Sequence, residues 1–223
     1  AQYIRKGKTI VLMKPSLPSY WFDICIIPQH DSPPKNKNII ETNGALNSIK
    51  FNANKKKKLG LILVGGISTH YKWDSKYVSN QINKIISTNK DIDWTIADSS
   101  RTPKNLMPMI TISNKKNTNK LNFNGPLKKD IKQLIYAAEI IWVSPDSVSM
   151  VFEALTSGAS VGLLDIKENK KSRIHKTIKH LILNGHVTTF VSWKKTNKLK
   201  DNNMQLNEAC RCANILFNKG FLS

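Results

Sequence analysis

The stretch EIIWVSPDSVSMVFEALTSGASVGLLDI, residues 139–166, decides the fold of this chain. The apolar run Glu139–Ser144 predicts a buried strand, and the turn Pro145-Asp146 after it supplies a helix N-cap. The helix carries its apolar residues on one stripe, at Val148, Val151, Phe152 and Leu155. Gly158 ends the helix, and a second strand follows at Val161–Ile166. Strand, helix and strand in this order make a βαβ unit and imply a parallel sheet.

The opposite face of this helix is polar. Ser149 and Glu153 are spaced i, i+4, so they stack on one side of the helix above Asp146. Open α/β sheets bind ligands at the carboxyl ends of their strands, so this face is a candidate site for the ribose and phosphate groups of a nucleotide. An ordinary N-cap at Asp146 and a solvated Glu153 account for the same spacing, and both interpretations stay open at this point.

Length and composition set the class of protein. A chain of 223 residues is long enough for one or two domains with real cores, and a hydrophobic fraction of 40% is typical of a soluble globular protein. No apolar run approaches the ~20 residues that a membrane helix needs. The N-terminal residues lead into strand-like sequence rather than a cleavage site. We therefore expect a cytoplasmic protein.

The formal net charge is +20, but 31 of the 35 basic residues are Lys and only four are Arg. Arg is the residue that reads bases and forks onto phosphates, and the sequence has no zinc-finger, helix-turn-helix or aromatic RNA-binding motif, so we expect no specific nucleic acid partner. Abundant Asn and Ile accompany the Lys, which is typical of AT-rich coding sequence. Compositional drift is one explanation of the charge, and attraction to anionic lipid head groups or generic nucleic acid is the other.

The three cysteines, Cys25, Cys210 and Cys212, are too few and wrongly spaced for a zinc site, and an odd number argues against a disulfide framework. Cys25 lies in the strand-like run FDICIIP and is expected to be a small core residue. We expect no metal and no cofactor. Reduced thiols fit a cytosolic protein best.

Strand-like and helical stretches alternate along the chain. Strands are predicted at residues 9–13, 22–28, 59–64, 94–97, 110–112, 140–144, 161–166 and 187–193. Helices are predicted at residues 76–88, 128–138, 147–157, 171–184 and 205–218. This alternation again implies βαβ units and a parallel sheet.

The lysine-rich run at residues 53–58 looks like a linker between two regions. Residues 59–200 then form a complete, doubly wound Rossmann-like domain. Residues 1–52 hold only two predicted strands, too few to bury a core, so they are expected to be the C-terminal part of a first Rossmann-like domain. Residues 201–223 add a last helix, which would lack the partner that it has in a whole two-domain fold. We expect an α/β protein of two such domains, the first incomplete.

A glycine pair follows the strand predicted at residues 59–64. Gly65 and Gly66 would let backbone N–H groups approach a phosphate closely, and Ser68 would add a hydroxyl donor. The loop has neither the spacing of a dinucleotide-binding loop nor that of a P-loop, and a simple tight turn explains the paired glycines equally well.

The strand predicted at residues 94–97 leads into a loop with one of the four Arg residues. Arg101 and Thr102 lie among hydroxyl side chains before a proline that can start a helix, which suits a phosphate clamp. A salt bridge from Arg101 to Asp98 or Asp146 is the structural alternative.

The strand predicted at residues 22–28 ends in Gln29-His30-Asp31. His30 beside Asp31 at a strand end could act as a general base for an acceptor hydroxyl, since histidine titrates near neutral pH and a carboxylate raises its basicity. Neighbouring side chains of an extended chain point to opposite sides, so a polar loop residue followed by a turn-forming Asp is an equal alternative.

Five motifs in a fixed order resemble a known family. They are PQHD at 28–31, ETNGALN at 41–47, LVGGIS at 63–68, SSRTP at 99–103 and PDSVSMVFEA at 145–154. The sequence thereby resembles the mitochondrial fission Elm-type proteins and their bacterial relatives, which are similar to GT-B glycosyltransferases. The resemblance covers nearly the whole chain and starts well inside the family's first domain, so the chain is expected to be truncated at its N-terminus.

In GT-B enzymes the second domain binds a nucleotide sugar, the first binds the acceptor, and no metal is required. The resemblance implies that Glu153 holds the ribose hydroxyls and that the Gly65-Gly66 loop follows the first strand of the donor domain. It also places Ser147, Ser149 and Met150 along the pyrophosphate and base.

The chain departs from the family pattern at three places, one of which is Asn124-Gly125-Pro126, where the family has Asn-Pro-Tyr. The family has two Arg where this chain has Ser100-Arg101, so half of the implied phosphate clamp is missing. A carboxylate at Asp146 would repel a pyrophosphate unless Arg101 or a Lys neutralises it.

We expect a glycosyltransferase that transfers a sugar from a nucleotide-sugar donor to a cell-envelope glycolipid or saccharide acceptor. Its place of action would be the cytoplasm, with peripheral contact at the inner face of an anionic membrane. The alternative is a non-catalytic adaptor at a membrane surface, as the fission role of the eukaryotic family members implies.

Overall fold

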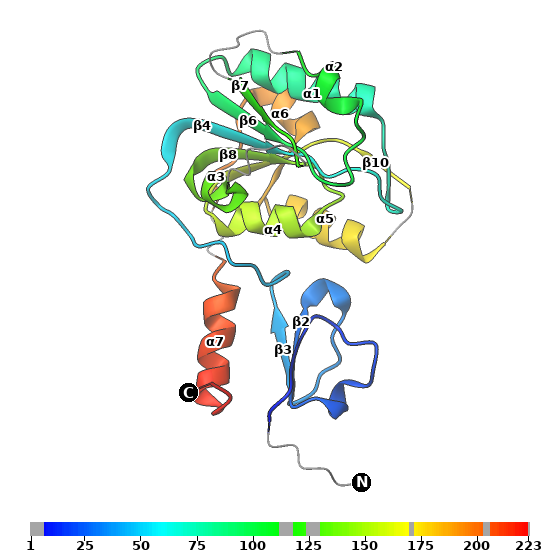
Figure 1. The fold of residues 1–223 in the computed structure, drawn as a ribbon, viewed down its shortest axis with the longest axis vertical. Coiled ribbons are helices and arrows are strands. Elements are labelled where there is room, and N and C mark those ends of the chain that lie inside the picture. Colours follow the sequence, from blue (N-terminus) through cyan, green and yellow to red (C-terminus); the bar gives the residue numbers. More distant parts are fainter. Residues whose placement is uncertain (1–6, 112–117, 124–129, 170–171, 203–205, 223) are drawn as a thin grey trace. The chain divides into compact units, whose positions relative to one another are not determined.

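The computed structural model describes residues 7–111, 118–123, 130–169, 172–202 and 206–222. The chain forms two compact units, of which the smaller combines residues 1–48 with 206–223 and the larger spans residues 49–205. The smaller unit is therefore discontinuous in sequence, and the whole larger unit is inserted into it. Figure 1 shows both units as ribbons.

The larger unit is built on a parallel sheet of six strands in the order β11-β9-β8-β4-β6-β7. The strands are β4 (Lys56–Leu63), β6 (Asp93–Ala97), β7 (Thr118–Leu121), β8 (Ala138–Val143), β9 (Ser160–Leu163) and β11 (Thr188–Thr189). The described helices are α1 (Ser75–Thr88), α2 (Leu106–Met109), α3 (Ile131–Ala137), α4 (Val148–Thr156), α5 (Arg173–Leu183) and α6 (Phe190–Thr196). In Figure 1, α1, α2 and α6 lie above the sheet and α3, α4 and α5 below it. The prediction of a doubly wound α/β fold is confirmed.

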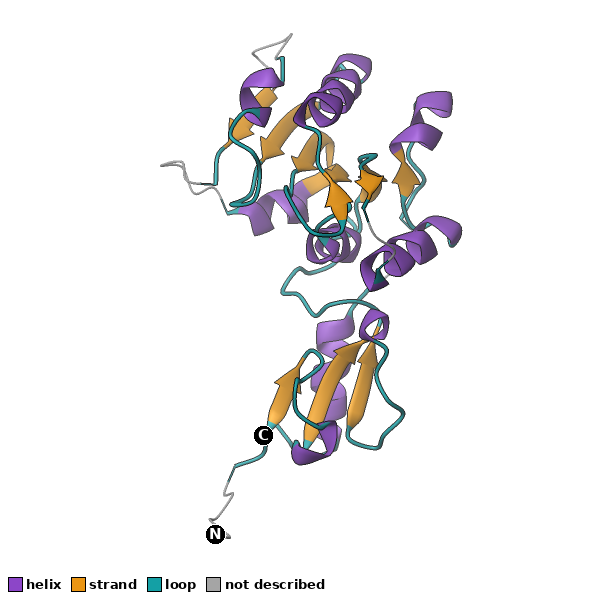
Figure 2. Ribbon diagram, turned by 90° about the vertical axis from the view of Figure 1, so that its right-hand side faces the viewer, coloured by secondary structure: helices purple, strands orange, loops and turns teal. Residues whose placement is uncertain are grey.

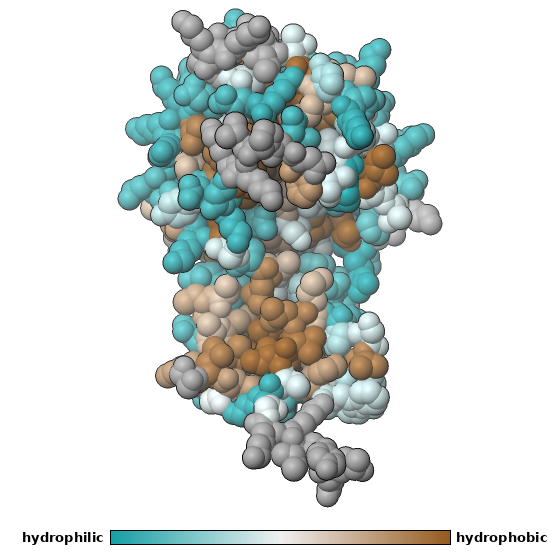
Figure 3. All heavy atoms as spheres, viewed as in Figure 1, coloured by the Kyte–Doolittle hydropathy of each residue, from teal (hydrophilic) through white to brown (hydrophobic). Residues whose placement is uncertain are grey.

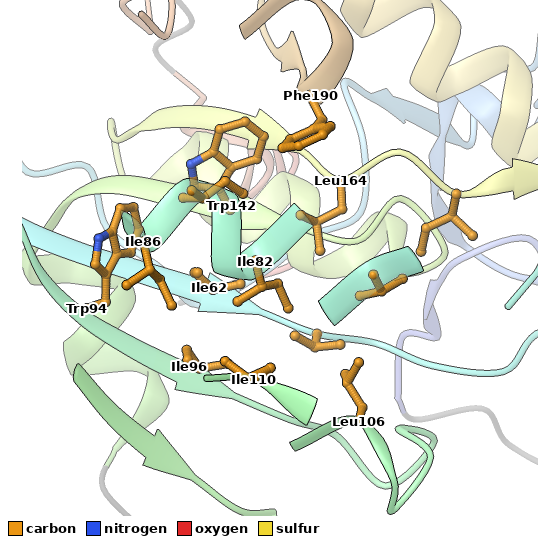
Figure 4. Close-up of a cluster of buried hydrophobic side chains, with 14 of the residues drawn as sticks. Ile62, Ile82, Ile86, Trp94, Ile96, Leu106, Ile110, Trp142, Leu164 and Phe190 are labelled. Carbon is orange, nitrogen blue, oxygen red and sulfur yellow. The ribbon is translucent and has the colours of Figure 1, made fainter. Parts of the chain in front are cut away.

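Three buried tryptophans organise the core on the α1 face of the sheet. Trp94 of β6 and Trp142 of β8, both labelled in Figure 4, lie on either side of β4. Trp142 packs edge-on against Trp193 of α6, with ring centroids 5.4 Å apart. The neighbouring strands make room for these rings with glycine. A Cβ at Gly60 would lie 2.5 Å from Trp94, and one at Gly162 would lie 2.5 Å from Trp142. Glycine is thus required in these strands by close packing.

The smaller unit is a parallel sheet of three strands in the order β1-β2-β3 with one helix packed on it. Its elements are β1 (Ile10–Leu12), the 3-10 helix η1 (Ser19–Trp21), β2 (Ile24–Pro28), the 3-10 helix η2 (Gln29–Asp31), β3 (Ile39–Thr42) and α7 (Glu208–Asn218). Figure 2 shows the helix behind these strands. Cys212 and Leu216 of α7 form a buried cluster with Ile24, Ile26 and Ile40. Cys25 is fully buried, as predicted.

Two expectations for this unit were wrong. The region holds a third strand, β3, in which Ile40 is buried while its neighbour Glu41 is exposed, an alternation too short to stand out in the sequence. The last helix also has a partner, since α7 covers the small sheet instead of standing alone.

Three predicted boundaries were also wrong. β4 begins at Lys56, inside the run expected to be a linker, because the exposed amino end of this central strand accommodates lysines. The run at residues 110–112 is not a strand where it is described: Ile110 is the C-cap of α2, and residue 112 lies outside the described residues. The run at residues 187–193 gives only the short β11, because α6 starts at Phe190 and turns Phe190 and Trp193 into the core.

A two-stranded antiparallel ribbon was not predicted. β5 (Tyr71–Lys72) pairs with β10 (Lys167–Glu168), which joins the segment after β4 to the segment after β9. Pairs of two residues leave too little periodicity to be recognised in a sequence. Among the described residues, no helix combines the length and apolarity needed to cross a bilayer.

Candidate functional site

The order of the sheet reverses beside β4. The chain runs from β4 outward through β6 to β7, and then returns to place β8, β9 and β11 on the other side. Loops that leave the carboxyl ends of strands at such a reversal diverge, and open α/β sheets bind ligands in the crevice between them. The loops after β4 and β8 therefore define the candidate site.

Asp146, in the loop after β8, is the central residue of this site. Its side chain has an exposed fraction of 0%, and Oδ2 accepts a hydrogen bond from the Gly66 N–H at 3.0 Å. The same oxygen lies 3.0 Å from Nη2 of Arg101, in the loop after β6. Oδ1 is buried and has no hydrogen-bond partner among the described residues. One carboxylate thus joins the loops that leave three neighbouring strands.

Burial raises the pKa of Asp146 above its ordinary value, because the charged form is desolvated. The nearby Ser144 hydroxyl, the Gly66 N–H and the Arg101 guanidinium oppose part of this rise. The carboxylate is consequently held by a small set of donors, and removal of Arg101 alone would leave a buried charge without its counterion.

The paired glycines pack tightly against their neighbours. A Cβ at Gly65 would overlap the Asp146 carboxylate, and one at Gly66 would overlap the backbone carbonyl of Arg101. The Gly65 N–H donates to Ser144 Oγ at 2.7 Å, while the Gly66 N–H donates to Asp146. Both N–H groups that were expected to meet a phosphate therefore have partners within the protein. Donor binding by these glycines stays a prediction.

The loop after β6 is bonded to the glycine loop. Ser99 Oγ donates to the Gly65 carbonyl at 2.9 Å, and Thr102 Oγ1 donates to the Val64 carbonyl at 3.1 Å. The salt bridge of Arg101 that was left open as an alternative is present, with Asp146 as its partner. The Arg101 side chain is nevertheless 42% exposed, so part of the guanidinium faces solvent and its role as a phosphate clamp stays a prediction.

Helix α4 presents its first turn beside these loops. The N-cap is Ser147, and the expectation that Asp146 would cap the helix was wrong, because its carboxylate is engaged by Gly66 and Arg101. Ser149 is exposed and Met150 is half-buried. Gly158 adopts a left-handed φ of 86° just after the helix, so the predicted stop is confirmed.

Glu153, four residues after Ser149, is half-buried on α4. Burial raises the pKa of Glu153, and the nearby Lys132 of α3 opposes the rise. A carboxylate that is partly desolvated yet still reached by solvent can accept hydrogen bonds from a ligand hydroxyl. Its assignment to ribose stays a prediction.

The remaining predicted residues have structural settings of their own. Ser68 Oγ accepts a hydrogen bond from the Tyr71 N–H at 3.3 Å and so helps to start β5. His30 and Asp31 belong to the 3-10 helix η2 of the smaller unit, where the Asp31 carbonyl accepts from Lys14 Nζ at 3.0 Å. The role of His30 as a general base, with Asp31 as the carboxylate that raises its basicity, stays a prediction. Across the ranges that the structure describes, no group of His, Cys, Asp and Glu side chains is arranged to hold a metal ion.

Sequence reasoning missed Ser144 and Ser99, whose hydroxyls connect the three loops. Both are small polar residues at or just beyond the end of a predicted strand. That position was a usable sign, because the carboxyl end of a strand is where loop contacts at a switch point form.

The family described as Mitochondrial fission ELM1 matches residues 1–219. The chain belongs to this family. No curated protein sequence matches it.

Solved structures show a more distant similarity, which three of them illustrate. MurG of Acinetobacter baumannii has a TM-score of 0.46 at 13% identity over 92% of this chain and 54% of its own. UDP-GlcNAc 2-epimerase of Neisseria meningitidis, bound to UDP-GlcNAc, has a TM-score of 0.42 at 12% identity. The match covers 71% of this chain and 44% of the epimerase. The pneumococcal O-GlcNAc transferase GtfA, in complex with UDP and GlcNAc, has a TM-score of 0.40 at 12% identity. The match covers 90% of this chain and 42% of GtfA. The chain spans about half the length of the structures that it matches.

Proposed function

We propose that this ELM1 family member is a nucleotide-sugar-dependent glycosyltransferase of GT-B type, and that its larger unit binds the donor. The observation that carries the proposal is the meeting of the loops after β4, β6 and β8 at the switch point of the sheet. There the half-exposed guanidinium of Arg101 lies beside the first turn of α4. A cation and a helix N-terminus together suit a diphosphate.

The proposed reaction needs no metal. An acceptor hydroxyl attacks the anomeric carbon of the donor sugar, its proton passes to a base such as His30, and the glycosidic bond to the diphosphate breaks. Arg101 and the N–H groups that begin α4 stabilise the charge that develops on the leaving nucleoside diphosphate. Glu153 binds the ribose hydroxyls and so orients the donor.

The acceptor that we propose is a cell-envelope glycolipid or saccharide, reached from the cytoplasmic face of a membrane. The support is electrostatic. A net charge of +20, carried mostly by Lys, attracts the protein to anionic lipid head groups.

The ribose assignment is tested by Glu153→Ala in a titration with nucleoside diphosphates. Loss of hydrogen bonds to a charged acceptor should weaken binding about 10- to 100-fold, without lowering the melting temperature. Asp91→Ala is the matched control, because it removes one carboxylate from an exposed turn of the same unit. Nucleotide affinity that is equal in Glu153→Ala and in the control would remove Glu153 from the site.

The role of Arg101 must be tested without leaving the buried carboxylate of Asp146 unpaired, since the two side chains form a salt bridge. The double variant Arg101→Gln, Asp146→Asn should be compared with Asp146→Asn alone. The added loss of the guanidinium should reduce affinity for a nucleoside diphosphate far more than for the nucleoside, and salt should shrink the difference. Equal losses for the two ligands would make Arg101 a structural residue only.

A non-catalytic adaptor at a membrane surface is the second candidate, and membership of a family described by mitochondrial fission favours it. An adaptor need not bind a nucleotide, whereas a transferase must. Absence of a thermal shift with any nucleoside diphosphate, together with binding to anionic vesicles, would favour the adaptor.

A further inference from the structure

A second concave site lies between α1 and the segment that follows β9. It is a pocket of about 720 Å³ whose lining includes Lys72, Trp73, Asp74, Tyr77, Asp165 and Lys167. Its volume falls in the range of small-molecule sites. None of these residues belongs to the candidate donor site, and the pocket lies wholly within the larger unit.

Two lysines face each other across the ribbon at the edge of this pocket. Lys72 of β5 is the direct cross-strand partner of Lys167 of β10. Like charges directly opposite each other in an antiparallel pair destabilise it. Both residues are exposed, and within the described part of the chain neither ammonium group has a hydrogen bond or an ion pair. Two exposed cations on the same side of a short ribbon can hold an anion between them.

The lining of the pocket also includes two aromatic side chains, Trp73 and Tyr77. The Tyr77 side chain is 45% exposed, and its hydroxyl donates to Asp165 Oδ2 at 2.5 Å. Trp73 donates from Nε1 to Ser75 Oγ at 3.0 Å and packs against the core. Flat apolar rings of this kind stack on sugar rings or on other flat ligands.

The carboxylates of the pocket are held in fixed positions. Gln81 braces Asp165 through two hydrogen bonds of 2.7 Å, one to its carbonyl and one from its N–H. Asp74 caps α1, accepting from the Tyr77 N–H at 3.0 Å. The Tyr77 hydroxyl bonds to one oxygen of Asp165, and the Tyr77 N–H bonds to one oxygen of Asp74. The second oxygen of each carboxylate can accept a hydrogen bond from a ligand hydroxyl. The pocket therefore combines a pair of cations with acceptors for hydroxyl groups and with a stacking surface.

The geometry points to a binding site for an anionic saccharide, that is, a sugar ring that carries a phosphate or a carboxylate. Lys72 and Lys167 hold the anionic group, Trp73 and Tyr77 flank the ring, and Asp74 and Asp165 accept from its hydroxyls. This site is separate from the proposed donor site and does not depend on it.

The experiment is isothermal titration of the full chain with glucose 1-phosphate, glucuronate, glucose and inorganic phosphate at low salt. Glucose 1-phosphate or glucuronate should bind more tightly than glucose or phosphate alone, and comparison of the two anions separates a phosphate site from a carboxylate site. The double variant Lys72→Gln, Lys167→Gln should lose about tenfold or more in affinity, because charge-assisted hydrogen bonds are removed.

The matched control is Lys76→Gln, Lys84→Gln, which removes the same charge from exposed positions of α1. Its affinity for the anionic sugar should equal that of the unaltered chain. Arg101→Gln, Asp146→Asn should also leave it unchanged, which keeps this result independent of the donor site. Equal losses in the two lysine pairs, no binding of either anionic sugar at millimolar concentration, or equally tight binding of inorganic phosphate would each overturn the proposal.

Discussion

The two units both pack helices on a parallel sheet, but the buried apolar clusters described in them differ greatly in size. On the α1 face of the larger unit, eighteen buried residues form one apolar cluster, whereas the cluster described in the smaller unit has five. Of the fifteen large apolar side chains that are exposed in the described ranges, seven belong to the smaller unit, although it is much the shorter. Figure 3 shows apolar side chains gathered on the smaller unit, while hydrophilic ones cover most of the larger. The smaller unit therefore has the smaller buried cluster and, for its length, more exposed apolar side chains.

Connectivity makes the two units unequal in a second way. The larger unit is continuous, but the smaller one joins its strands to α7 only across residues 49–205. If the larger unit unfolds, α7 must be held to the small sheet at the end of a long flexible loop, at an entropic cost of about 4 kcal/mol. We therefore expect the smaller unit to depend on the larger one, and not the reverse.

Val151→Asp should have the largest effect. Val151 of α4 is fully buried against the sheet, and an unpaired carboxylate there costs several kcal/mol. The larger unit should unfold, and the smaller unit should lose its structure with it because its loop is no longer closed. Circular dichroism and amide exchange would measure both events.

The control for this change is Ser149→Asp, which introduces the same charge at an exposed position of the same helix. It should remain folded. A Val151→Asp protein in which strands β1–β3 keep their exchange protection would refute the dependence of the smaller unit on the larger.

Leu216→Ala should have the next largest effect. Unlike Val151→Asp, it should destabilise the smaller unit and leave the larger unit folded. Leu216 of α7 is one of the five buried residues in the small cluster, so its truncation should destabilise the smaller unit by about 2–4 kcal/mol. Amide exchange should rise in β1–β3 and α7 and stay unchanged in the larger unit. Leu183→Ala, at a side chain 75% exposed, is the control. Increased exchange throughout the chain would show that the coupling is symmetric.

Gly162→Ala tests the packing of tryptophan on the large sheet. The added Cβ would lie 2.5 Å from Trp142, and overpacking of this kind costs about 1–3 kcal/mol. Chemical denaturation of the larger unit would measure it. At Gly7 an added Cβ meets no atom within 4 Å, so Gly7→Ala should be neutral. Equal stability of the two variants would mean that the sheet adjusts freely around Trp142.

Glu208→Gln should have the smallest effect and is confined to the smaller unit. Glu208 accepts from Arg211 Nε at 2.9 Å and from the Asn43 N–H at 2.9 Å, so it fixes the start of α7 to the loop after β3. Burial alone would raise the pKa of Glu208. The hydrogen bonds from Arg211 and Asn43 outweigh that effect and lower the pKa below its ordinary value. The variant should cost about 1 kcal/mol at neutral pH.

The pH dependence of that effect follows from its sign. A carboxylate whose pKa is lowered by folding stabilises the folded state above its ordinary value of 4.5, and this stabilisation is lost as the pH falls through the lowered value. The unaltered smaller unit should therefore lose stability in acid, and Glu208→Gln should lose less. Parallel acid transitions for the two proteins would exclude Glu208 as the cause.

The site and the pocket also differ in how far the sequence revealed them. Arg101, Asp146 and the glycine pair were found because polar residues directly after buried strands converge in a parallel sheet. The contact between Arg101 and Asp146 was one of two open alternatives, and the choice between a salt bridge and a free clamp depends on distances across three loops. The pocket was not found at all, since its walls come from two ribbon strands and one helix face.

The sequence by itself determined the alternation of strands and helices and the core stripe of α4. It also determined the stop at Gly158, since these depend on neighbours a few residues apart. Tertiary structure alone decided that Phe190 starts a helix rather than extending a strand, because burial of Phe190 and Trp193 against Trp142 outweighs the β propensity of that run. It alone turned Asp146 away from the helix it was expected to cap. A carboxylate takes the partners that the fold places nearest, and those were supplied by loops some 45 and 80 residues earlier in the chain.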